Sequence, residues 1–246
     1  MKLLTVGNPK IAKGEKLGYL TAILHLAPHT MSGYNTCPMA TAGCSSACLN
    51  TAGRGGMFAG CKTAHLSGSE MVNDIKSGNL VNFIQAARIR KTRMFFEHRV
   101  TFLSQLENEI RNFVKLAKKH GLTPVIRLNG TSDLRWENYG IIQKFPTLQF
   151  YDYTKIPNRR NLPSNYKLTF SLADGNESDV EKAIDNGMNI AVVFRTKKYP
   201  TVYMNLSVID GDEHDLRFLD PKGSVVALKA KGKAKYDTTG FVKDVV

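Results

Sequence analysis

The four cysteines of this chain are its most informative residues, because all of them lie between positions 37 and 61. Cys37, Cys44, Cys48 and Cys61 follow the spacing Cys-x6-Cys-x3-Cys-x12-Cys in a stretch rich in glycine. Grouped thiolates are the ligands that soft metal ions and iron–sulfur clusters prefer. The sequence therefore predicts that these four side chains form a metal or cluster site.

The spacing favours an iron–sulfur cluster over zinc. Structural zinc sites usually contain paired Cys-x2-Cys motifs, and this stretch has none. Irregular gaps suit a [4Fe–4S] cluster, whose irons are spread over a larger polyhedron than one ion. Zinc, redox thiols and disulfides stay open as alternatives. Cys61 is either the fourth ligand or a buried cysteine, and in the second case three ligands would leave one iron open.

Composition limits the class of protein. The 246 residues fit a single domain (1–246) with a cluster-binding loop over 30–66. The mean hydropathy is negative, and neither a membrane span nor an export signal is recognisable, so we expect a cytoplasmic protein. A reducing cytoplasm disfavours disulfides. The net charge of +13 would attract an anionic small molecule or nucleic acid, or it serves solubility alone. The oligomeric state does not follow from the sequence.

The elements around the cysteines alternate between strands and helices. An apolar strand within Leu17–His29 precedes the cysteine loop, and a helical region over about 79–120 follows it. Apolar segments then recur around a short helix over 177–187. This alternation predicts an α/β protein with a partial, incomplete TIM-like βα barrel. The expected later strands lie within 123–133, 148–155, 166–176 and 189–198.

Several of these strands end in polar side chains. The carboxyl ends of parallel strands form the face on which α/β proteins bind ligands. Ordinary strand-end loops are also rich in Asn and Asp, so the repetition across four strands is what favours a site. The candidate ligand-binding residues are Arg127, Asn129, Asp133, Asp152, Tyr153, Lys155, Asp174 and Arg195.

Other charged groups are weaker candidates. The basic run Arg88–Arg93 is better explained as a solvated helix face than as a phosphate contact. Alternating lysines at 229, 231, 233 and 235 would share one face of a strand and could meet a polyanion. The acidic group over 210–215 is better explained as a polar turn than as a cation site, and His25 and His29 as structural residues.

The motifs resemble those of the bacteriophage gene-product-88 family. The similar segments are Cys37-Pro38-Met39-Ala40 through Cys44, Cys48 and Gly53, then Arg127–Asp133, Asp210–Asp212 and Val226–Gly232. The resemblance spans about residues 17–235 and implies a phage-encoded protein acting in the host cytoplasm. It implies no defined activity.

A looser architectural resemblance is to radical S-adenosylmethionine enzymes. These have a partial barrel with a cluster-binding cysteine loop directly after the first strand, although their usual spacing is Cys-x3-Cys-x2-Cys. The resemblance implies S-adenosylmethionine as a cofactor. We therefore expect a [4Fe–4S] protein with a redox or cluster-dependent enzymatic role. The alternative is a non-catalytic module with a structural cluster or zinc, which binds nucleic acid or a host protein through its basic surface.

Overall fold

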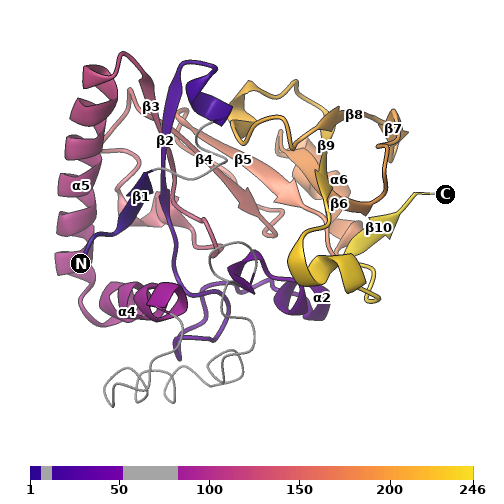
Figure 1. Ribbon diagram of the computed structural model, residues 1–246, viewed down its shortest axis with the longest axis horizontal. Coiled ribbons are helices and arrows are strands. Elements are labelled where there is room, and N and C mark those ends of the chain that lie inside the picture. The colour runs from indigo at the N-terminus through magenta and orange to yellow at the C-terminus, as the bar shows by residue number, and fades with distance from the viewer. Residues whose placement is uncertain (7–12, 52–82, 246) are drawn as a thin grey trace.

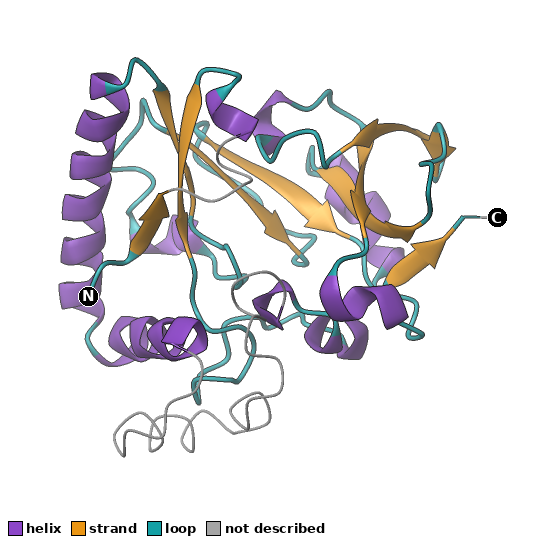
Figure 2. Ribbon diagram, in the orientation of Figure 1, coloured by secondary structure: helices purple, strands orange, loops and turns teal. Residues whose placement is uncertain are grey.

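The computed structural model describes residues 1–6, 13–51 and 83–245. In these residues a ten-stranded sheet is combined with helices in a mixed α/β fold (Figure 2). The strands are β1 (Leu4–Val6), β2 (Tyr19–Leu24), β3 (Thr123–Arg127), β4 (Gln149–Thr154), β5 (Tyr166–Ser171), β6 (Asn189–Arg195), β7 (Val202–Tyr203), β8 (Leu206–Asp210), β9 (Ser224–Lys229) and β10 (Val242–Asp244). The helices are α2 (Ala42–Ser46), α4 (Phe83–Glu97), α5 (Arg99–Lys119) and α6 (Val180–Asp185).

The centre of the sheet is parallel. Strands β2, β3, β4, β5, β6, β9 and β8 lie side by side in that order, while β1 and β7 are antiparallel edge strands. The expected α/β class and the parallel strand–helix units are therefore confirmed. Among the described strands the two edges do not pair with each other, so the sheet is open.

One edge of β6 is shared by two strands. Strand β5 pairs with residues 189–191 of β6, and β10 pairs in parallel with residues 193–195. The other edge of β6 is occupied by β9. Beyond the end of β5, β10 therefore takes its place beside β6. Figure 1 places α2 and the short turn of residues 232–236 at this carboxyl end of the parallel strands.

Helix α5 covers one face of the sheet through the apolar stripe expected from the sequence. The buried residues recur at three- and four-residue spacing and belong to the main core with β2 and β3. The helix ends at Lys119, and Gly121 two residues later has a φ of +68°, which suits glycine and lets Leu122 donate to Ala117. The stripe consists of Phe102, Leu106, Ile110, Phe113 and Ala117.

The predicted helical region is two helices where it is described. His98, with φ −133° and ψ 53°, separates α4 from α5. The change of direction (Figure 1) accompanies an aromatic cluster around the fully buried Phe95, whose ring lies 5.3 Å from that of Phe102 and 5.2 Å from that of Trp136. Within the described residues, no helix has both the length and the apolar character needed to cross a membrane.

Candidate functional site

A cavity of about 220 Å³ lies at the carboxyl ends of the parallel strands. Its lining comes from three parts of the chain that are distant in sequence: the cysteine segment, the strand ends, and the last strands with the turns around them. The principal polar and sulfur-bearing residues are Cys37, Cys44, Cys48, Arg127, Asn129, Ser132, Asp133, Tyr153, Lys155, Ser171, Asp212, Lys229 and Lys231.

Three of the four cysteines line this cavity. Cys37, Cys44 and Cys48 are half-buried and form no disulfide. Cys61, the predicted fourth ligand, lies outside the described residues. The structure thus gathers three thiols at the ligand-binding end of the sheet, which is where the sequence places the cysteine loop.

Helix α2 holds the middle cysteine and is fixed by a long-range contact. The Thr41 hydroxyl caps the helix by accepting a hydrogen bond from the backbone N–H of Cys44, 3.1 Å away. The Asp174 carboxylate accepts from the Thr41 hydroxyl and, over 3.0 Å, from the Gly43 N–H. Asp174 follows β5, so this carboxylate ties the cysteine segment to the sheet. It does not line the cavity.

Burial acts against ionisation of two of the thiols. Desolvation raises the pKa of Cys48 to about 11 and also raises the pKa of Cys37. Backbone N–H groups oppose this, because His29 donates to the Cys37 sulfur over 3.3 Å and Asn50 donates to the Cys48 sulfur over 3.5 Å. A bound metal or cluster would supply the positive charge that thiolates need here.

A cationic side chain also lies near Cys48. The guanidinium of Arg88, in α4, lowers the pKa of Cys48 and donates to the side-chain oxygen of Asn50. The sequence favoured a solvated helix face for the run that begins at this residue. Two of its members are instead engaged inside the protein, since the Lys91 ammonium donates to the Leu3 carbonyl over 2.6 Å. An isolated basic run gives no sign of these distant partners.

The three described thiols form no preassembled site for a single metal ion. In the described part of the chain, no group of three or more His, Cys, Asp or Glu side chains is placed to hold a metal ion. The three thiols are nevertheless near enough to influence one another's ionisation, since Cys37 and Cys44 both raise the pKa of Cys48. Thiolates are the ligands that iron–sulfur clusters prefer, so these three residues are the ones that would hold such a cluster.

The predicted strand-end residues divide into two groups. Five line the cavity, and three lie outside its lining. Since side chains alternate between the faces of a sheet, neighbours along β4 point in opposite directions. Tyr153 lines the cavity whereas Asp152 does not, and Thr154 and Lys155 line it where the strand ends. The lining group is Arg127, Asn129, Asp133, Tyr153 and Lys155, and the other group is Asp152, Asp174 and Arg195.

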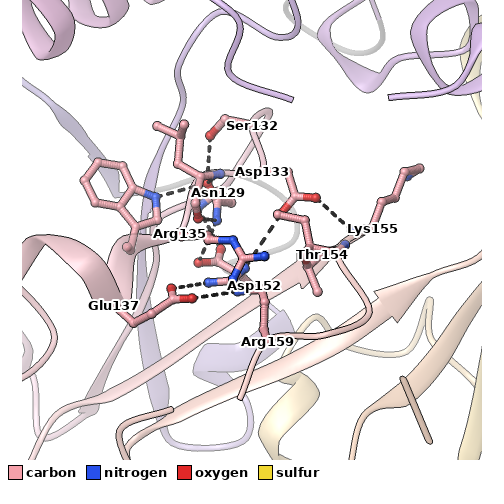
Figure 3. Close-up of polar contacts among 12 residues, drawn as sticks. Asn129, Ser132, Asp133, Arg135, Glu137, Asp152, Thr154, Lys155 and Arg159 are labelled. Carbon is pink, nitrogen blue, oxygen red and sulfur yellow. Dashed lines mark hydrogen bonds and ion pairs between the residues drawn. The ribbon is translucent and has the colours of Figure 1, made fainter. Parts of the chain in front are cut away.

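The side chain of Asn129 is engaged in a network of hydrogen bonds with Ser132, Leu134 and Trp136, which forms a polar brace (Figure 3). Its side-chain oxygen accepts from Trp136 Nε1 over 3.0 Å, from the Ser132 hydroxyl over 2.9 Å and from the Leu134 N–H over 3.0 Å. Its side-chain amide donates to the Leu134 carbonyl over 2.9 Å. These bonds hold the loop after β3 in one conformation.

Asp133 extends the brace to β4. Its carboxylate accepts from the Lys155 backbone N–H over 2.7 Å and forms an ion pair of 3.7 Å with Arg159. Arg159 is fully buried and also binds Glu137 (Figure 3). The brace fixes the backbone from which the Lys155 side chain extends.

Asp152 is buried on the helix-covered face of the sheet. It accepts hydrogen bonds from the Asn129 N–H over 2.7 Å and from the Tyr166 hydroxyl over 2.8 Å. Burial nevertheless raises its pKa to about 7, against an ordinary value of 3.8. Its contacts join β3, β4 and β5.

Arg127 lines the cavity, and its positive charge is paired with a carboxylate. Its guanidinium is 2.9 Å from the Asp215 carboxylate and 4.7 Å from the centre of the Tyr153 ring. Asp215 comes from the acidic group in which the sequence favoured a polar turn. Arg195 is outside the lining, because its guanidinium pairs with Asp244 on β10 at 2.8 Å.

The remaining sequence candidates are placed as follows. Lys229 ends β9, and residues 232–236 form a 3-10 turn, so the expectation that the four alternating lysines share one strand face is wrong. Lys231 forms an ion pair with Asp212 at the cavity.

The histidine His25 does not line the cavity, and burial lowers its pKa to about 3.

The comparisons with known proteins identify a family and no further relative. The family model described as Gene product 88 matches residues 2–245. No curated protein and no solved structure matches, so neither comparison supports the likeness to radical S-adenosylmethionine enzymes. With nearly the whole chain matched, the protein belongs to the Gene product 88 family.

Proposed function

We propose that this protein binds a [4Fe–4S] cluster through Cys37, Cys44 and Cys48 and has a redox or cluster-dependent enzymatic role. The observation that carries the proposal is that three thiols line one cavity at the carboxyl ends of parallel strands. When bound, such a cluster supplies one-electron transfer or, at an iron without a protein ligand, a position for a substrate. A TIM-like partial barrel, with the cavity at its ligand-binding end, is part of this proposal.

The surroundings of the thiols support this assignment. Arg88 and the backbone N–H groups of His29 and Asn50 favour the thiolate forms that bind iron. The Asp174 contact fixes α2, and thereby Cys44, relative to the strand ends. Hydrogen bonds to ligating sulfurs are among the features that set a cluster's reduction potential.

The test is anaerobic purification followed by iron, sulfide and zinc analysis and by EPR of the reduced protein. We expect about four irons and four sulfides per chain. Replacing Cys37, Cys44 or Cys48 with Ser should abolish the signal, whereas Ser45→Ala, an exposed position in the same helix, should preserve it. Stoichiometric zinc without iron would overturn the proposal.

Two further samples define the role. Cys61→Ser should retain the cluster if three thiolates suffice, and should lose it if Cys61 is the fourth ligand. Addition of S-adenosylmethionine to the reduced protein tests the radical-enzyme version, which requires a changed EPR spectrum. An unchanged spectrum would leave electron transfer or another cluster-dependent reaction as the role.

A further inference from the structure

The Lys155 side chain lines the cavity and carries a positive charge. Its side chain extends away from the brace around Asn129 (Figure 3), and Nζ donates to the Ser171 hydroxyl over 3.0 Å. Within the described residues, no carboxylate forms an ion pair with it. The carboxylate of Asp133 is engaged by the Lys155 backbone N–H and by Arg159.

Two of the three other cations of the cavity have a carboxylate partner. Arg127 is paired with Asp215, and Lys231 is paired with Asp212. Lys229 is exposed, and its backbone N–H donates to the same Asp212 carboxylate over 2.8 Å. The lining therefore contains more positive than negative charge. A half-buried ammonium without a counterion favours an anion in the neighbouring space.

Part of the lining is apolar. The Lys155 ammonium lies 5.7 Å from the centre of the Phe241 ring. Val193, Leu228, Ala47 and Ala234 complete apolar parts of the wall. A volume of about 220 Å³ is below the range of roughly 300–1,000 Å³ of drug-sized pockets, which favours a small ligand.

We propose that this cavity binds a small organic carboxylate, whose charged group contacts Lys155 and Ser171 and whose apolar body contacts Phe241, Val193 and Leu228. The proposal concerns the same cavity as the cluster but does not require the cluster to be present. The apolar wall distinguishes this ligand from inorganic phosphate, which would gain nothing from Phe241 or Leu228.

The test measures binding of a carboxylate series to the full-length protein by calorimetry and by the shift in thermal unfolding. Acetate, butanoate and hexanoate are the probes, with hexanamide as the neutral match of hexanoate and inorganic phosphate as the purely polar anion. We expect affinity to rise with chain length, because each methylene adds buried apolar surface. Hexanamide and phosphate should bind much more weakly than hexanoate.

The variants assign the effect to one side chain. Lys155→Gln keeps two of the four methylenes and removes the charge, and it should raise the dissociation constant of hexanoate roughly 10- to 100-fold, as expected when a charged hydrogen bond is lost. Lys155→Arg should restore part of the affinity. Lys167→Gln removes a lysine outside the cavity, hydrogen-bonded to the Gly187 carbonyl, and should leave binding unchanged.

Three outcomes would overturn the proposal: equal binding by Lys155→Gln and the unmodified protein, equal binding of hexanoate and hexanamide, or phosphate binding as tight as that of hexanoate. Iron and sulfide are measured on the same samples. Loss of the cluster with retained hexanoate binding would contradict only the cluster assignment, and the reverse result would contradict only the carboxylate site.

Discussion

The carboxylate of Asp174 accepts a hydrogen bond of 3.0 Å from the backbone N–H of Gly43, although the two residues are 131 positions apart. Asp174 follows β5, and Gly43 lies in the helix that contains Cys44. The contact joins the cysteine segment to the sheet and, together with the Thr41 cap, fixes the start of α2. A residue that the sequence placed among the ligand-binding groups thus positions the thiols.

Replacement of this carboxylate should impair cluster loading more than folding. Asp174→Ala removes both acceptors and leaves the Gly43 N–H unpaired, a loss of about 1–3 kcal/mol of local stability. We expect a clear decrease in iron and sulfide per chain after anaerobic reconstitution, with an unchanged far-UV circular dichroism spectrum. Asp185→Asn, at an exposed position in α6, is the matched control. Full cluster loading in Asp174→Ala would show that this contact does not position the thiols.

Position 43 should tolerate no side chain. A Cβ atom at Gly43 would lie 2.0 Å from the Thr239 hydroxyl oxygen and 2.8 Å from Phe241 Cβ, so the helix or the segment of residues 239–241 would have to move. We expect Gly43→Ala to destabilise the protein by about 1–3 kcal/mol, measured by urea unfolding, despite the higher helix propensity of alanine. Ser45→Ala, on the exposed face of the same helix, should be neutral.

The sequence predicts the strands and helices around the site better than it predicts which residues line the cavity. The apolar stripe of α5 and the alternation of strands with helices predict the parallel strands, and the position of the cysteines after the first predicted strand, which is β2, predicts their place at the carboxyl ends. The edge strand β1 is not among the predicted strands. Strict side-chain alternation along β4 could also have separated Asp152 from Tyr153. The pairing of Arg195 with Asp244 depends on β10 joining β6, and the Asp174–Gly43 contact depends on tertiary packing, so local patterns could indicate neither.

Asp152 should make the stability of the protein depend on pH. Burial raises its pKa from 3.8 to about 7, so the folded state binds a proton that the unfolded chain releases. Its contribution to stability is therefore fully present below about pH 4 and is lost as the pH rises through about 7. Urea unfolding of Asp152→Asn between pH 4.5 and 7.5 should show a smaller fall in stability than the unmodified protein shows. Asp185→Asn should keep the original slope, and identical slopes for Asp152→Asn and the unmodified protein would contradict this assignment.

Arg88 should control the reactivity of one thiol. Because its guanidinium lowers the pKa of Cys48, Arg88→Gln should raise that pKa and slow alkylation of Cys48 by iodoacetamide several-fold near pH 8.5. Peptide mass mapping of the cluster-free protein separates Cys48 from the other thiols, and a rate profile from pH 7 to 9.5, below that pKa, reports the decrease. Arg90→Gln changes an exposed arginine of the same helix and should leave the profile in place. Equal alkylation rates of Cys48 in Arg88→Gln and in the unmodified protein would contradict this assignment.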